Sequence, residues 1–248
     1  FKERVINKVQ FFTYKVYNSF EDHLNEVEFP EKVEINLSED EFFEKQHAGW
    51  LAQISAAAIG TMLEGYSTEK IREAYGEVDY YLRKPSTQND DILYELAFLD
   101  TIKINGKELT THDIALEWLS KVDYAWSAEE AAIRNLHMGL FPPESATVCN
   151  FWNEWIGAQM RGAVCGMVAP GDPKYAAELA WKDGAVSHIN NGILGEAFNA
   201  MLVSNAFIYE SVRDNLKTTI DLIPKESEYY SVIKFALDQC EKFDNWEE

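Results

Sequence analysis

The interpretation of the whole chain depends on one segment, Ser86-Thr87-Gln88-Asn89-Asp90-Asp91-Ile92-Leu93-Tyr94-Glu95. It opens a strongly apolar helix, expected to end near Ile104, with Asn89 as a polar cap followed by two adjacent carboxylates. Adjacent carboxylates repel each other, and burying them costs free energy unless a cation or hydrogen-bond donors compensate. The segment is therefore either an acid-rich helix start or part of a metal site.

The two interpretations rest on different features of the same segment. As a cap, Asn89 with Asp90 and Asp91 complements the helix dipole, which is worth roughly 0.3–1 kcal/mol for each charge. As a metal site, the segment begins a helix so apolar that its start is expected in the interior, where paired carboxylates need Mg²⁺, Mn²⁺ or Ca²⁺. Taken alone, the segment favours the cap.

Glu64 is the candidate for a third oxygen ligand or a general base. A capping box, Ser38 with Glu41, opens a helix that is expected to run towards Gly65. The helix is apolar and rich in small residues, so we expect it to be buried against another backbone. A Glu near a helix C-terminus opposes the dipole, which suggests a use other than local stability.

The helical spacing of apolar residues predicts an all-α fold in a single compact multi-helix domain. Residues 1–44 are expected to form an N-terminal extension packed on the core, and residues 45–248 the helical domain itself. One helix is predicted through Trp152 and Met160, with Ala158, Gly162 and Gly166 on its small-residue face. Another is predicted from Ile193 to about Val212, and strand alternation is absent.

Composition narrows the classes of partner. The 248 residues carry a formal net charge of −20, which argues against nucleic acid and anionic membranes as partners. No apolar run is long enough to cross a bilayer, and no secretory leader is visible, although a sequence that begins at Phe1 is compatible with a leader already removed. Cys149, Cys165 and Cys240 lack zinc-ligand spacing, so we expect buried thiols in a reducing cytoplasm.

Other catalytic patterns are weak or absent. No Gly-x-Ser-x-Gly elbow, phosphate loop, dinucleotide fingerprint or cysteine–histidine pairing is present. Taken alone, His188 is expected to be a core residue. Asp90-Asp91-x-x-x-Glu95 resembles the first metal motif of class I terpene synthases, but their second motif is missing. A magnesium-dependent terpene synthase therefore remains an outside alternative.

A series of short motifs together resembles the ADP-ribosylglycohydrolase family. The resemblance covers roughly residues 45–245 in the family's order and approximate spacing. Each motif is weak alone, but the set is specific. The motifs are Met62–Gly65, Asn89–Asp91, Asn150–Gly162, Val168–Pro173, Ala176–Ala180 and Val186–Ile193.

This resemblance implies an all-α hydrolase with a centre of two Mg²⁺ or Mn²⁺ ions. Its substrate would be an ADP-ribosylated protein or small molecule, cut between the ribose and the acceptor. By position, Asp90 and Asp91 match the paired aspartates, Asn89 stands where Thr is usual, and Glu64 matches the acid of the first helix. Metal ligands would thus be Glu64, Asn89, Asp90 and Asp91, with Glu64 and Asp91 catalytic.

The resemblance also implies which residues bind substrate. Gly157, Ala158, Gln159 and Arg161 match the loop whose backbone amides hold the substrate phosphates. Ser187 and His188 match the segment that lines the ADP-ribose cleft.

One departure from the family pattern affects the metal centre. Family members carry a second acidic motif, Asp-x-Asp-Thr/Cys-Asn, near the C-terminus, and this sequence contains no Asp-x-Asp. We therefore expect the chain to correspond to the N-terminal two-thirds of the family and to bind metal incompletely. The alternative to a hydrolase is a catalytically impaired protein of the same fold that binds ADP-ribose or has a structural role.

Overall fold

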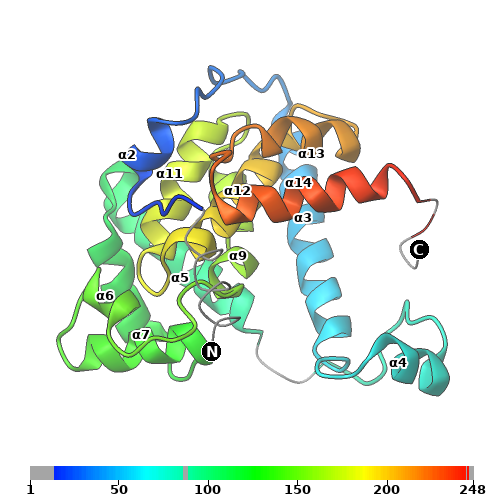
Figure 1. Cartoon of the computed structure of the whole chain (residues 1–248), viewed down its shortest axis with the longest axis horizontal. Coiled ribbons are helices and arrows are strands. Elements are labelled where there is room, and N and C mark those ends of the chain that lie inside the picture. The colour runs from blue at the N-terminus through cyan, green and yellow to red at the C-terminus, as the bar shows by residue number, and fades with distance from the viewer. Residues whose placement is uncertain (1–13, 86–88, 244, 246–248) are drawn as a thin grey trace, which may run out of the picture. The chain divides into compact units, whose positions relative to one another are not determined.

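The computed structural model describes residues 14–85, 89–243 and 245 (Figure 1). Within these ranges the regular elements are all helices, which confirms the predicted all-α class. They are α2 (Phe20–Leu24), α3 (Glu39–Gly60), α4 (Thr68–Tyr75), α5 (Asp90–Asn105), the 3₁₀ turn η1 (Gly106–Glu108), α6 (Thr111–Lys121), α7 (Ser127–His137), α8 (Glu144–Thr147), α9 (Gly157–Met160), α10 (Ala163–Val168), α11 (Pro173–Gly184), α12 (Asn190–Asn205), α13 (Val212–Ile220) and α14 (Glu228–Cys240).

The chain divides into two compact units. Of the described residues, those up to Ile35 and from Tyr94 onward form unit 1, and those within Asn36–Leu93 form unit 2. Helix α5 therefore begins in unit 2 and continues into unit 1. The predicted boundary between residues 44 and 45 stays a prediction.

The core of unit 1 is built around α11 and α12. Both helices bury most of their residues, and α9 and α10 pack on α12. The small-residue positions predicted from spacing make this approach possible. A Cβ added at Gly162 would lie 2.7 Å from the carbonyl oxygen of Glu196, and one at Gly166 would lie 2.7 Å from the backbone nitrogen of Ser204.

The helix predicted through Trp152 and Met160 is wrong. Turns occupy residues 151–156, and the chain becomes helical only in α9 and α10. Asn150 explains the difference, because its side-chain amide donates to the carbonyl oxygens of Ala128 (3.1 Å) and Ser187 (2.9 Å). These two distant contacts fix the chain in a path that a continuous helix does not follow.

The helix predicted from Ile193 to Val212 also differs, since α12 begins at Asn190 and ends at Asn205. The Asn205 side chain donates to Thr219 Oγ1 at 2.9 Å, and the Asn205 carbonyl accepts from Ile208 N–H at 2.8 Å in the following turn. A separate helix, α13, then starts after Ser211, whose hydroxyl accepts from Asp214 N–H. The sequence interpretation missed α13.

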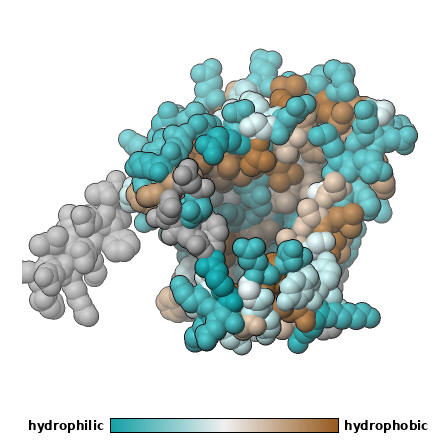
Figure 2. Space-filling model, turned by 90° about the vertical axis from the view of Figure 1, so that its right-hand side faces the viewer, coloured by the Kyte–Doolittle hydropathy of each residue, from teal (hydrophilic) through white to brown (hydrophobic). Residues whose placement is uncertain are grey.

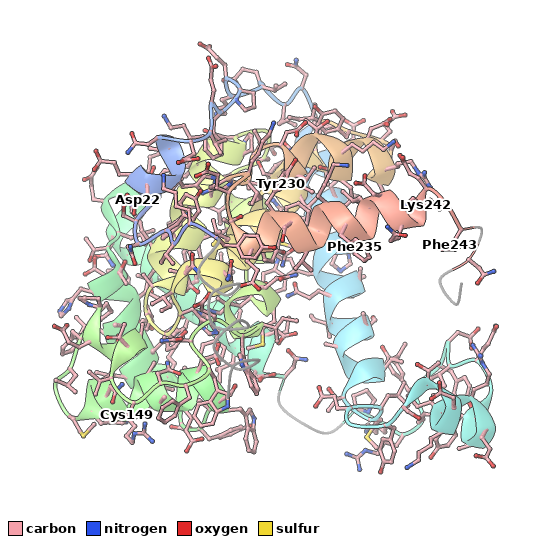
Figure 3. All side chains as sticks on the ribbon, viewed as in Figure 1. Asp22, Cys149, Tyr230, Phe235, Lys242 and Phe243 are labelled. Carbon is pink, nitrogen blue, oxygen red and sulfur yellow. The ribbon has the colours of Figure 1, made fainter. Side chains whose placement is uncertain are left out.

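The N-terminal part of unit 1 is anchored through His23 of α2, the helix on which Figure 3 labels Asp22. His23 is wholly buried; its Nδ1 accepts from Trp181 Nε1 at 3.1 Å, and Nε2 lies 2.7 Å from the Leu222 carbonyl oxygen. A buried histidine with both ring nitrogens satisfied in this way is neutral. Burial lowers the pKa of His23 to about 4.

Unit 2 contains α3, α4 and the first turn of α5. The predicted capping box is confirmed, since Ser38 Oγ accepts from Glu41 N–H and Glu41 accepts from Ser38 N–H. Helix α3 ends at Gly60, short of Gly65, and none of its residues is buried. The expected burial of this helix is therefore not found.

Figure 2 shows hydrophilic residues over much of the face it draws, with hydrophobic patches between them. No helix of the described residues is both long and apolar enough to cross a membrane. Of the three thiols expected to be buried, only that of Cys165 is; Cys149 and Cys240 are exposed.

Candidate functional site

Asn89, Asp90 and Asp91 lie together at the start of α5. Asn89 acts as the cap, because its Oδ1 accepts from Ile92 N–H at 3.1 Å and its backbone carbonyl accepts from Leu93 N–H at 3.2 Å. Asp90 and Asp91 occupy the first helical turn and are half-buried. The cap interpretation of Asn89 is confirmed, and it leaves the two carboxylates at a position favoured by the helix dipole.

Glu64 lies in the turn that follows α3 and is exposed. Among residues 14–85, 89–243 and 245, no three His, Cys, Asp or Glu side chains are placed to hold a metal ion. Glu64 is thus not brought together with Asp90 and Asp91 into a three-ligand centre. Its role as ligand or base stays a prediction.

A small cavity in unit 2 adjoins the start of α5. Its volume is about 100 Å³, and its lining consists of Ile54 and Ala58 of α3, Thr61 and Met62 just after that helix, and Arg83, Pro85 and Asn89. In a chain with net charge −20, a guanidinium beside a helix N-terminus is a local feature that suits an anionic ligand.

Arg161, at the end of α9, is the centre of a buried ionic network in unit 1. Its Nη1 donates to Glu129 Oε1 (2.7 Å) and to the Gly157 carbonyl (3.0 Å), and its Nε donates to Asp183 Oδ2 (2.5 Å). Its Nη2 donates to Ser187 Oγ at 3.1 Å. Only 1 % of Arg161 is exposed.

Aromatic rings complete the surroundings of the guanidinium. Its Cζ lies 4.8 Å from the ring centre of Trp118 and 5.3 Å from that of Tyr94, distances typical of cation–π contact. Burial opposes the charge on Arg161, but its acidic neighbours, Asp183 first, outweigh burial and raise the pKa of Arg161 above its ordinary value. The guanidinium is therefore permanently charged.

Ser187 and His188 belong to the same network. Ser187 Oγ lies 2.7 Å from His188 Nδ1, and both residues are almost completely buried. Burial, with a smaller contribution from the charge of Arg161, lowers the pKa of His188 well below its ordinary value. His188 is therefore neutral, as expected of a core histidine.

The predicted substrate-binding residues divide between the interior and the surface. Gly157, Ala158, Arg161, Ser187 and His188 are buried, and Gln159 is half-buried. The structure joins Gly157, Arg161, Ser187 and His188 in one network. Their side chains reach other protein groups, so their contact with substrate stays a prediction.

The sequence interpretation missed the acids of this network, Glu129, Asp183 and Glu196. The only trace of these acids in the sequence is a set of glycines that make room for them. A Cβ at Gly157 would collide with Glu129, and a Cβ at Gly162 or Gly184 would collide with Glu196. Three glycines near acidic residues do not reveal that arrangement without the fold.

Exposed aromatic rings lie immediately before α9. Phe151 is 84 % and Trp155 is 59 % exposed, and each makes an edge-to-face contact with Trp152, with ring centres 6.3 and 6.4 Å apart. Flat apolar rings that face solvent can stack on a nucleobase.

Comparison with known proteins supplies one match. A family model described as ADP-ribosylglycohydrolase matches residues 38–247. No curated protein and no solved structure matches the chain.

Proposed function

Because the chain belongs to the ADP-ribosylglycohydrolase family, we propose that it hydrolyses the bond between ADP-ribose and a protein side chain or small acceptor. The observation that carries this proposal is the match over residues 38–247, which includes both the paired aspartates of α5 and the Arg161 network. The terpene-synthase alternative has no support in that match.

The donor chemistry at the start of α5 fits a magnesium ion. Mg²⁺ is often held by one or two carboxylates while it keeps several waters and contacts substrate oxygens. Asp90 and Asp91, adjacent and half-buried, provide two such carboxylates. Two carboxylates are enough for one ion; a second ion needs further ligands, which the described residues do not gather.

The protein groups would act on the ribose and on water. A bound Mg²⁺ or Mn²⁺ would supply positive charge near the ribose hydroxyls. Asp91, or Glu64, would accept a proton from the water that attacks the anomeric carbon. Their carboxylates would also stabilise the positive charge that develops on the sugar.

The substrate phosphates need local positive partners because the chain is strongly acidic. In unit 1 these would be the backbone N–H groups of the Gly157–Arg161 turn. In unit 1 Trp155 and Phe151 would offer rings to adenine, next to the Gly157–Arg161 turn. The Arg161 network would keep that turn in place.

A second candidate is an ADP-ribose-binding protein without turnover. It is favoured by Asn89, whose side-chain oxygen is engaged by Ile92 N–H, and by the lack of a three-ligand group among the described residues.

Two measurements on one preparation distinguish the candidates. Isothermal titration would measure ADP-ribose binding with and without Mg²⁺, and release of ADP-ribose from arginine- and serine-modified peptides would measure turnover. The hydrolase predicts both binding and magnesium-dependent release. Binding without release would support the second candidate.

A further inference from the structure

The carboxyl group of Glu196 lies in the interior of unit 1 without a hydrogen-bond donor. Glu196 is 0 % exposed, and neither of its oxygens accepts a hydrogen bond from a described residue. Asp183 Oδ1 is likewise without a donor, although Asp183 is only 2 % exposed. Three buried carboxyl oxygens without donors are costly unless a proton joins the two groups.

The surrounding backbone is shaped to hold the Glu196 side chain. A Cβ at Gly184 would lie 2.6 Å from Glu196 Oε2, and one at Gly162 would lie 2.9 Å from Glu196 Cγ. Both glycines have ordinary negative φ, so they are needed here for space. The carboxyl group is therefore a packed part of the core.

The charges that face Glu196 do not balance if every acid is ionised. Arg161 is the cation, and Asp183 of α11 and Glu129 of α7 are the acids with which it pairs. The other titratable groups nearby are Cys165 of α10, which interacts with Glu196 and with Glu95 of α5, and His188, which is neutral. Of the remaining neighbours of α12, α13 buries Asn215, Thr219 and Ile220, and α14 contributes Tyr229, whose ring contacts Phe198. The cations of these two helices, Arg213, Lys217 and Lys234, are exposed.

We propose that Glu196 and Asp183 share one proton in the interior of unit 1, and that loss of this proton as the pH rises destabilises the packing of α9 and α11 on α12. The proposal concerns unit 1 alone and is independent of hydrolase activity.

The proton belongs to Glu196 and is donated to Asp183. Asp183 Oδ2 accepts from Arg161 Nε at 2.5 Å, and its Oδ1 is open to a donor. Glu196 Oε2 lies against Gly184, the residue that follows Asp183, where an added Cβ would be 2.6 Å away. Burial, followed by the charge of Asp183, raises the pKa of Glu196 well above its ordinary value.

The direction of the pH effect follows from this assignment. The folded protein holds the proton at pH values where the unfolded chain has lost it. Stability is therefore full below the unfolded pKa of about 4.3 and declines as the pH rises towards the folded pKa of Glu196.

Infrared spectroscopy tests the proton directly. At neutral pH the wild-type protein is expected to show the carbonyl stretch of a protonated carboxylic acid, and Glu196→Gln is expected to lack it. Glu178→Gln, a partly exposed acid on α11, is the matched control and should keep the band. A wild-type spectrum without the band, or a band that persists in Glu196→Gln, would overturn the proposal.

Unfolding in urea tests the coupling to stability. Between about pH 5 and 8, the folding constant of the wild type should fall relative to that of Glu196→Gln by about tenfold per pH unit, up to the folded pKa. The ratio of wild type to Glu178→Gln should change much less. A pH-independent ratio for Glu196→Gln would contradict the proposal, and the infrared measurement on the wild type decides the matter if Glu196→Gln does not fold.

Discussion

Arg161 Nε lies 2.5 Å from Asp183 Oδ2, with 1 % and 3 % of the two side chains exposed. The pair joins the end of α9 to the last turn of α11, and Glu129 of α7 engages the same guanidinium. A salt bridge that is taken out of water in this way is stable only while each charge keeps its partner.

Replacing Asp183 by Asn should therefore destabilise the fold strongly. Arg161 would keep its charge and lose one of its two acids, and breaking a buried pair costs about 3–5 kcal/mol. Urea unfolding at neutral pH gives the free energy of unfolding. Glu178→Gln, which breaks the partly exposed pair with Lys182 on the same helix, should cost less than about 1 kcal/mol. Equal losses for the two variants would show that the Arg161 pair has no special role.

Gly166→Ala should destabilise unit 1 because α10 and α12 approach closely at this residue. The added Cβ would lie 2.7 Å from the backbone nitrogen of Ser204, and overpacking of this kind costs about 1–3 kcal/mol. Gly60→Ala, at the last residue of α3, meets nothing within 4 Å and should be neutral or stabilising by up to about 1 kcal/mol. Thermal or urea unfolding compares the two, and a neutral Gly166→Ala would mean that α10 and α12 lie further apart.

Acidification should destabilise the protein through His23. The folded pKa of His23 is about 4, below its ordinary value of 6.5, so the unfolded chain binds the proton first. Stability from this group is full above pH 6.5 and is lost as the pH falls towards 4, by roughly 3 kcal/mol in total. His23→Gln should show a smaller loss between pH 7 and pH 4.5 in urea unfolding. The same acid dependence in both proteins would exclude His23 as a source.

Trp155→Ala should weaken ADP-ribose binding if the exposed ring stacks on adenine. Stacking on an aromatic side chain is worth about 1–3 kcal/mol, so the dissociation constant should rise by about tenfold or more. Phe235→Ala on α14, which removes a ring that is 65 % exposed and labelled in Figure 3, is the control and should leave binding unchanged. Titration calorimetry measures both, and equal affinities would remove Trp155 from the site.

Helix starts were the part of the fold that could be predicted best from sequence. The hydrogen bonds of Ser38, Asn89, Asp172 and Ser227 reach backbone N–H groups three residues further along the chain, so the local sequence determines them. The predicted caps at Ser38 and Asn89 are confirmed, and Asp172 and Ser227 cap their helices in the same way.

The missed features depend on contacts between distant residues. The turns before α9 follow from Asn150, whose partners Ala128 and Ser187 lie 22 and 37 residues away. Asp183 and its partner Arg161 lie 22 residues apart in the chain, and no local pattern links them. A buried acid is recognised only when the fold shows what surrounds it.

The candidate metal site shows the same limit. Asp90 and Asp91 are adjacent in the chain and share the first turn of α5, which the sequence alone predicts. The position of Glu64 relative to these two carboxylates depends on the path of the turn after α3. The spacing of the three residues along the chain does not determine that path.

Magnesium-dependent release of ADP-ribose is the measurement that tests the proposed hydrolase most directly. The wild type should release ADP-ribose from a modified arginine or serine peptide with Mg²⁺ and stop when the metal is chelated. Asp91→Asn should lose at least about a hundredfold of this rate, since a carboxylate that serves both metal and proton transfer is removed. Asp79→Asn, an exposed acid of unit 2 with the same change of charge, should keep the rate. Release that is unaffected by chelation and equal in wild type and Asp91→Asn would contradict the account.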